Sequence, residues 1–541
     1  MSQVDPRHLL SELKDNTLKK DSIKAGIVLS YLDQVDRSTQ DGLLSILEQA
    51  EPGFCVPLLA GLIHKKTGIS RELPRVREIL TMKSLEDPEL LLTMIRDGIE
   101  PRELFISLAA EARIDGAGEV LLEILDSELD EEILGPAITG LGVLGHSKAV
   151  NPVSEYLYSN SKHLIIRAIK ALEGMGTPTA MHRLAEKTGH DHQMDILILD
   201  VFSRIQDRTS LERLNQAIGS HFAHLRTYAK ERLVRIGPKA VPMLGENLST
   251  DDPDLQIHTL NVLGAIGDVS ALVFIRKLIS RQPGDPNVRF AAFEALGMLP
   301  LDKGAYILAR GLTDQEEHVC VAAASAIDRN LSEILVAGVR NMVRQKDHDA
   351  IKTVRAVINA QAKNLFMSLI EVAAFQEMAM THLSRNCPPD RRAFFHELLQ
   401  KYGYPDLAQR IGIQEDQEDK RPVAVAVDDS RMILNIYKAT LYEMGFEPVL
   451  FEYPDQALEW IRDNRPRAVF TDLNMPGMTG IELTTALRQI FPGPDLPIIM
   501  VTTQNEAQDK EDALKAGVSG ITFKPFTRAG LEKALKDTSR A

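Results

Sequence analysis

The chain has 541 residues, more than one hydrophobic core usually supports, so its length predicts two or more domains. Hydrophobic residues make up 44% of the chain and charged residues 26%, as in globular proteins, and no apolar run is long enough for a membrane-spanning helix. The formal net charge of −14 argues against a primary nucleic-acid role, because an acidic surface repels the phosphate backbone.

The N-terminal segment MSQVDPRHLLSELKD has no basic stretch followed by an apolar one, so the sequence predicts no secretory signal and favours a cytoplasmic location. Cys55, Cys320 and Cys387 lie far apart and form no CxxC pair. This pattern favours thiols in a reducing compartment over a metal or redox site. Residues 1–99 are predicted to form an N-terminal helical region.

Residues 100–335 form a repeating helical pattern. Apolar residues recur there with helical spacing, and short segments that end a helix follow one another every 30 to 33 residues. These segments end at Asp115, Gly145, Gly176, Gln206, Gly237, Gly267 and Pro300. A fixed period of this length indicates stacked units, each too small to bury its own apolar face. Pro57 precedes Pro242 by about six periods, which is compatible with an array that begins near residue 40.

The pattern within one unit is clearest in residues 239–268. Pro242 suits the first turn of a helix, where its missing N–H is harmless. The segment STDDP then interrupts the chain, and a second helix follows. That helix is predicted to end at Gly264–Gly267, where glycine permits a left-handed cap. Each unit is therefore expected to be a pair of helices.

These units resemble the short form of the HEAT repeat found in bilin-lyase-type repeat proteins. The second helix of that repeat often carries an arginine, which Arg226 and Arg289 provide, whereas the equivalent Ile165 and Gln256 do not. Solenoids of such repeats present long concave surfaces, so the resemblance implies protein–protein binding. Residues 336–411 are also predicted to be helical but lose the period, as expected of a cap or adaptor.

Two further segments precede the C-terminal part. The segment HTLNVLG, which begins at His258, has a faint similarity to the H-x-L-K-G segment of histidine phosphotransfer helices, but Asn261 replaces the usual lysine. The repeat already accounts for this helix, so we interpret His258 as a residue on a repeat face. Residues 412–421 are predicted as a linker, because the charged segment QEDQEDKRP begins within them.

Residues 422–538 show a different pattern, in which short apolar runs alternate with amphipathic helices. The predicted strands are 423–427, 448–451, 468–471, 497–502 and 520–523, and the predicted helices are 430–444, 455–464, 480–490, 506–516 and 527–537. Continuous apolar strands separated by helices predict a parallel sheet covered on both faces. The expected fold class is therefore multidomain, an all-α solenoid followed by an α/β domain.

Polar residues stand where these strands end. Asp428 and Asp429 follow the first strand, Asp472 the third and Lys524 the fifth, and Thr502 ends the fourth. The carboxyl ends of parallel strands face one crevice, so these side chains are expected to converge. Adjacent carboxylates repel one another, and Mg²⁺ would relieve the repulsion because it binds carboxylate and phosphate oxygens. A lysine and a hydroxyl there suit a phosphoryl group.

Four motifs, VDDS, TDLNMPGMTG, MVTT and TFKPF, occur in this order, and together they resemble the receiver domain of two-component response regulators. The similarity runs from about Val423 to Lys536. It implies a flavodoxin-like sheet with the strand order 2-1-3-4-5. It also implies a bacterial phosphoacceptor regulator, with phosphoryl transfer and hydrolysis as its only catalysed steps, rather than a metabolic enzyme.

The resemblance assigns the metal and the phosphoryl group by position. Asp472 is expected to be the phosphoacceptor, which attacks the phosphohistidine of a sensor histidine kinase. Mg²⁺ is expected to bind Asp428, Asp429, Asp472 and the backbone carbonyl of Asn474.

The same resemblance assigns the switch. Lys524 is expected to contact the phosphoryl group, and Thr502 to swing toward it. The peptide bond before Pro525 is expected to be cis, as is typical of the family. Ile521 stands where the family commonly has an aromatic residue that follows the threonine, so the switch of this chain is expected to differ.

The order of the two parts shapes the functional hypotheses. The receiver-like part comes last, and no helix-turn-helix, kinase-like or GGDEF-like motif accompanies it. Our leading hypothesis is that phosphorylation of Asp472 modulates the interactions of the solenoid with a protein partner. One alternative is a phosphate sink or relay whose solenoid only recruits the kinase. Another is a lyase-like enzyme, for which the array offers no cluster of nucleophiles or metal ligands. We expect neither nucleic-acid binding nor membrane insertion.

Overall fold

The computed structural model describes residues 5–66, 68–189, 191–220, 223–301, 306–385, 387–412, 421–429, 431–473, 475, 477–493, 495–502, 507–524 and 526–538. The chain divides into two compact units, Met1–Arg213 and Leu214–Ala541, which are treated one at a time below. Among the described residues, no helix is both long enough and apolar enough to cross a membrane.

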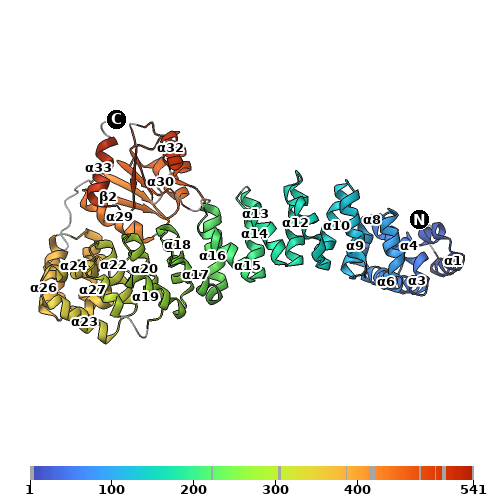
Figure 1. The fold of residues 1–541 in the computed structure, drawn as a ribbon, viewed down its shortest axis with the longest axis horizontal. Coiled ribbons are helices and arrows are strands. Elements are labelled where there is room, and N and C mark those ends of the chain that lie inside the picture. The colour runs from blue at the N-terminus through green and yellow to red at the C-terminus, as the bar shows by residue number, and fades with distance from the viewer. Residues whose placement is uncertain are drawn as a thin grey trace. The chain divides into compact units, whose positions relative to one another are not determined.

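The first unit is helical throughout its described residues (Figure 1). Its elements are α1 Pro6–Leu18, α2 Ser22–Leu29, η1 Leu32–Gln34, α3 Arg37–Glu48, α4 Pro52–Lys65, α5 Ile69–Glu72, α6 Pro74–Glu86, α7 Pro88–Arg96, α8 Arg102–Glu111, α9 Ala117–Ser127, α10 Glu131–Leu144, η2 Ser147–Ala149, α11 Val150–Glu155, η3 Tyr156–Tyr158, α12 Lys162–Met175, α13 Pro178–Lys187, α14 His192–Ile205 and the start of α15 Arg208–Ile218.

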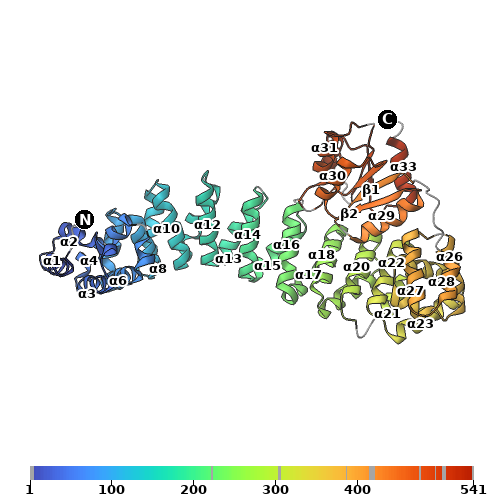
Figure 2. The ribbon, with the colours of Figure 1, turned by 180° about the vertical axis from the view of Figure 1, so that it is seen from behind.

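The second unit begins with more helices of the same kind (Figure 2). They are α16 Ala223–Ile236, η4 Gly237–Ala240, α17 Val241–Asn247, α18 Pro253–Ile266, η5 Val269–Ala271, α19 Leu272–Ser280, α20 Pro286–Met298, α21 Tyr306–Gly311, α22 Glu317–Arg329, α23 Glu333–Arg344, α24 His348–Asn359, α25 Lys363–Leu369, α26 Ala373–Arg385, α27 Pro389–Lys401 and α28 Pro405–Ile411. We call the helices α16–α28 the array helices. The predicted linker 412–421 lies largely outside the described residues.

Aspartate–proline pairs begin several helices in both units. The carboxylates of Asp87, Asp252 and Asp285 each accept a hydrogen bond from a backbone N–H of the helix that follows, which satisfies a donor that has no partner inside the helix. A proline occupies the next position in each case, where its fixed φ suits the first turn. Each pair therefore helps to define where its helix begins.

The residues that end the helices account for the predicted period. Gly145, Gly176 and Gly267 cap α10, α12 and α18 with φ of 65°, 58° and 69°, a left-handed conformation that glycine adopts at little cost. Gln206 caps α14 in the same conformation with φ of 51°. Gly264, which the sequence grouped with Gly267 as a cap, instead lies inside α18. A Cβ there would lie 3.1 Å from the backbone of the next repeat, so Gly264 permits close packing.

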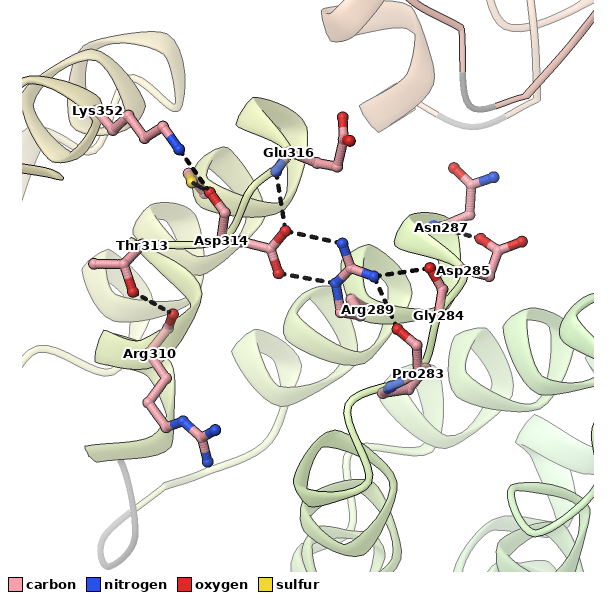
Figure 3. A network of polar contacts seen from close by, with 11 residues as sticks. Pro283, Gly284, Asp285, Asn287, Arg289, Arg310, Thr313, Asp314, Glu316 and Lys352 are labelled. Carbon is pink, nitrogen blue, oxygen red and sulfur yellow. Dashed lines mark hydrogen bonds and ion pairs between the residues drawn. The ribbon is translucent and has the colours of Figure 1, made fainter. Parts of the chain in front are cut away.

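The second helix of three array repeats is tied to the loop before it by one side chain. Arg226, Gln256 and Arg289 each donate a hydrogen bond to the backbone carbonyl six residues earlier. Arg289 also pairs with both carboxylate oxygens of Asp314, at 2.9 Å and 3.0 Å (Figure 3). Gln256, which breaks the arginine pattern in the sequence, therefore keeps the same hydrogen bond, because a side-chain amide also donates N–H.

The C-terminal part of the second unit is a five-stranded parallel sheet in the order β2-β1-β3-β4-β5, as predicted. Its strands are β1 Val423–Val427, β2 Glu447–Phe451, β3 Ala468–Thr471, β4 Ile498–Thr502 and β5 Gly520–Phe523. Its helices are α29 Arg431–Glu443, α30 Pro454–Asp463, α31 Gly480–Arg488, α32 Ala507–Lys515 and α33 Arg528–Thr538. The described strand and helix bounds lie close to the predicted ones.

Alternate residues of strand β1 pack into two hydrophobic layers, one on each face of the sheet. Ala424 and Ala426 of β1 pack with side chains of α29 and α33, whereas Val425 and Val427 pack with those of α30 and α31. Successive side chains of a strand point to opposite faces, so apolar residues at every position bury both faces of the sheet. This packing fixes the positions of the strand ends along one edge of the sheet.

Candidate functional site

Backbone hydrogen bonds extend the sheet one residue past its strands and position three charged side chains. The N–H of Asp428 donates to the carbonyl of Phe451 at 3.1 Å, and that of Asp472 to the carbonyl of Val427 at 2.9 Å. The N–H of Lys524 donates to the carbonyl of Thr502 at 2.9 Å. Because the strands are parallel, these three residues meet at one edge of the sheet.

The loop after Asp472 returns tightly to the sheet. Thr479 caps α31, and its side chain and that of Glu482 form a reciprocal capping box. The N–H of Gly480 donates to the carbonyl of Leu473 at 2.9 Å. A Cβ on Gly480 would lie 2.1 Å from the carbonyl oxygen of Asp472, so only glycine lets α31 begin this close to the site.

The acidic side chains form a compact cluster. One carboxylate oxygen from each of Asp428, Asp429 and Asp472 lies within 4.8 Å of the others. The Lys524 ammonium lies 2.7 Å from Asp428 and 3.1 Å from Asp472. The structure thus brings together four of the predicted site residues. Asn474 and Pro525, together with the predicted cis bond before Pro525, lie outside the described residues.

The charges of this cluster are strongly perturbed. Burial raises the pKa of Asp428 to about 7, with repulsion from Asp472 adding to it and Lys524 opposing it. Loss of surrounding water, followed by repulsion from Asp472, raises the pKa of Asp429. Burial alone would lower the pKa of Lys524, but the adjacent Asp428 and Asp472 carboxylates outweigh it and raise that pKa. Without a metal, the site holds more negative charge than one lysine offsets.

The two predicted switch residues lie in different surroundings. Thr502 is buried at the end of β4, next to the backbone of Lys524. Ile521 of β5 is half-buried and packs against a small cluster that includes Leu473 and Met500. Phe523, two residues later, is 39% exposed. The aliphatic Ile521 is therefore part of the local packing of β5.

A cavity of about 150 Å³ opens in front of the acidic cluster, and array helices of the same unit line its other side. Lys230 of α16, His258 of α18 and Glu294 of α20 are among the residues that line it. No motif in the sequence pointed to Lys230, and His258 was predicted only as a residue on a repeat face. Such a neighbourhood depends on how separate segments pack, which periodicity does not encode.

Comparisons with known proteins agree with the geometry. The family model described as the response regulator receiver domain matches residues 424–536, and that described as HEAT repeats matches residues 241–328. A chemotaxis protein CheY homolog of Campylobacter jejuni is 39% identical over 115 residues, which cover 21% of this chain and 88% of that protein. The chemotaxis protein CheY1 of Helicobacter pylori is 38% identical over 114 residues, covering 21% of this chain and 92% of the relative.

Among solved structures, chemotaxis protein CheY4 of Vibrio cholerae is 31% identical and matches with a TM-score of 0.21, covering 22% of this chain and 98% of its own. The sheet order, the acidic cluster and the similarity to short receiver proteins all concern the same C-terminal residues. The chain belongs to the response regulator family through this receiver domain, which follows a helical region that contains HEAT repeats.

Proposed function

We propose that Asp472 accepts a phosphoryl group from a sensor histidine kinase and that this modification changes the protein–protein interactions of the array. The observation that carries the proposal is the cluster of three carboxylates within 4.8 Å, with Lys524 3.1 Å from Asp472. Asp472 is largely buried, but it lines the cavity in front of the cluster, so its carboxylate can act as a nucleophile there, and the adjacent lysine can contact the charge of the product.

The proposed transfer forms one bond and breaks another. A carboxylate oxygen of Asp472 bonds to phosphorus while the bond between phosphorus and the histidine nitrogen of the kinase breaks. The imidazole, which carries a proton on its other ring nitrogen, departs in its neutral form. Lys524 then donates N–H to a phosphoryl oxygen, and Thr502 donates its hydroxyl. Hydrolysis reverses the modification when water attacks phosphorus, which releases inorganic phosphate and restores the carboxylate.

The chemistry of the donor set fits Mg²⁺. Asp428, Asp429 and Asp472 would hold the ion, and we propose the carbonyl of Asn474, outside the described residues, as a further ligand. When bound, the ion supplies positive charge that neutralises the carboxylates and the phosphoryl oxygens. Hard oxygen ligands and room for water are what this cation requires.

The array is proposed as the part that carries the signal to a partner. HEAT repeats match residues 241–328, and stacked repeats present extended binding surfaces. Within this proposal, residues 100–335 form the repeat solenoid and residues 336–411 the cap or adaptor beside it.

The test compares partner binding by the wild-type chain and by Asp472→Asn, each with and without Mg²⁺ and a small phosphodonor, in extracts of the source cell. The wild-type chain should gain or lose specific proteins when the donor is added, and Asp472→Asn should not respond. Identical binding under all four conditions, with rapid turnover of the phosphoryl group, would instead favour the phosphate sink.

The binding of Mg²⁺ should depend on pH near neutrality. The pKa of Asp428 in the folded, metal-free chain is about 7, above its ordinary 3.8. A proton on Asp428 therefore stabilises the metal-free fold below about pH 4, and this contribution is lost as the pH rises through about 7. Because Mg²⁺ must displace that proton, its affinity should be roughly tenfold weaker at about pH 6 than at about pH 8.

Calorimetric titration of Mg²⁺ in buffers of different ionisation enthalpy would measure both the affinity and the protons released. Asp428→Asn should bind the ion more weakly and lose most of this pH dependence. Equal affinities for the wild-type chain at the two pH values would contradict the expectation.

A further inference from the structure

Within the second unit, the receiver domain contacts the array helices along α29. Lys438 of α29 forms an ion pair with Asp390 of α27. Glu443, at the end of α29, is exposed, and charged residues that include Glu317 of α22 and Arg355 of α24 lie within electrostatic reach of it. Ile433, near the start of α29, lines the cavity that α16, α18 and α20 share with the acidic cluster. Both ribbon views draw α29 next to α20 and α22 (Figures 1 and 2).

The cavity leaves room for a phosphoryl group while the receiver stays in contact with the array. Its volume is about 150 Å³. At the roughly 30 Å³ that a water molecule takes in the liquid, this is space for about five waters. A phosphoryl group on Asp472, with a metal ion and its waters, occupies space of that order. Modification of Asp472 therefore does not by itself require the two parts to separate.

The array side of the cavity contains a lysine ammonium and a histidine nitrogen that has no hydrogen-bond partner among the described residues. Lys230 is largely buried there, within electrostatic reach of Asp429 and Asp472. The Nδ1 atom of His258 is buried and has no hydrogen-bond partner among the described residues. Nearby Arg226 and Lys230 help to lower the pKa of His258, after burial, so its ring is neutral. Asp254 and Glu294 also line the cavity, and burial raises the pKa of Glu294.

We propose that Lys230 is a second phosphoryl-binding lysine, supplied by the array, through which the array detects phosphorylated Asp472. Its ammonium donates to a phosphoryl oxygen on the side of the group away from Lys524, in the cavity that His258 also lines. The phosphoryl group adds negative charge opposite this ammonium, so phosphorylation tightens the contact between receiver and array. This inference rests on the proposed phosphorylation of Asp472.

The packing of Ile521 favours a switch in which the phosphoryl group contacts the array directly. Ile521 is held in the packing of β5 and has no aromatic ring to follow Thr502. Lys230 and Asp472 line the same cavity, and α29 contacts the array at the same interface. A phosphoryl group can thus act on the array without a rearrangement of β4 and β5.

The test measures hydrogen exchange in α16, α18 and α29 of the full chain with Mg²⁺ alone and with Mg²⁺ plus fluoroberyllate as a phosphoryl analogue. Fluoroberyllate should slow exchange in these helices by about tenfold, the effect of one hydrogen bond to a charged group. Lys230→Met should abolish this difference, whereas Lys230→Arg should retain most of it. Lys277→Met, an exposed lysine of α19, is the matched control and should behave like the wild-type chain.

Phosphoryl incorporation at Asp472 from a small phosphodonor is measured by mass on the same proteins. Absence of incorporation in the wild-type chain would overturn the proposed function itself. Normal incorporation with faster exchange in α16 and α18, or with equal protection in Lys230→Met and the wild-type chain, would overturn only the role of Lys230. Thermal unfolding of Lys230→Met and Lys230→Arg establishes that both variants fold, so that a lost response reports on the site.

Discussion

Incubation of the full chain with Mg²⁺ and a small acyl phosphate should add one phosphoryl group to Asp472, and Asp472→Asn should reduce incorporation to background. The amide of asparagine has almost the shape of the carboxylate but is no nucleophile. It also removes one of three mutually repelling carboxylates, so the variant should be at least as stable as the wild-type chain. Intact mass, followed by peptide mapping under conditions that preserve acyl phosphates, measures the product.

Two matched variants separate the site from its surroundings. Asp429→Asn keeps the proposed nucleophile but removes a proposed metal ligand, and incorporation should slow by about tenfold or more. Asp455→Asn changes an exposed carboxylate in the first turn of α30 and should have no effect. A phosphoryl group that persists in Asp472→Asn, or that maps to another residue, would contradict the assignment.

The receiver domain could be predicted almost completely because local pattern and topology coincide there. Each apolar run is long enough to identify a strand. The first, third, fourth and fifth runs end at the polar residues that line the crevice. Asp428 and Asp472 are far apart in sequence, yet the register that pairs Val427 with Thr471 places them side by side. Parallel pairing of buried strands leaves little freedom in this arrangement.

The cavity wall supplied by the array could not be predicted. Lys230 has no motif around it, and its presence in the same cavity as Asp472 depends on packing between α29 and the array helices. An arginine in the second helix was also too narrow a criterion for recognising a repeat. Gln256 makes the hydrogen bond that Arg226 and Arg289 make, since what the loop requires is an N–H donor at that place.

The period of the repeats predicted helix ends, but it left the inner glycines of segments such as LGVLG without their actual role. Gly142 of α10 faces Ala171 of α12, and a Cβ on Gly142 would lie 2.4 Å from the Cα of that alanine. Gly174 of α12 meets the carbonyl oxygen of Gly142 in the same way, at 2.4 Å from its own missing Cβ. The backbones of α10 and α12 therefore touch, which a side chain on either helix would prevent.

Gly142→Ala should consequently destabilise the α10–α12 contact by about 2 kcal/mol. Alanine favours a helix over glycine by roughly 1 kcal/mol, but overpacking costs about 1–3 kcal/mol, and here the obstructing atoms are backbone. Neither helix can yield by rotating a side chain, so the steric cost outweighs the gain in propensity. Hydrogen exchange of α10 and α12 in the full chain should then be roughly 30-fold faster, a measurement that reports local rather than global unfolding.

The matched control is Gly61→Ala in α4, where a new Cβ would meet nothing within 4 Å. With no steric cost, only helix propensity remains, and exchange in α4 should slow by up to about fivefold, or roughly 1 kcal/mol. Slower exchange at both sites would mean that α10 and α12 can move apart without penalty. Glycine is replaced by alanine in both variants, yet exchange should become faster at one site and slower at the other. The comparison therefore tests the close approach of the two backbones and not a general effect of removing glycine.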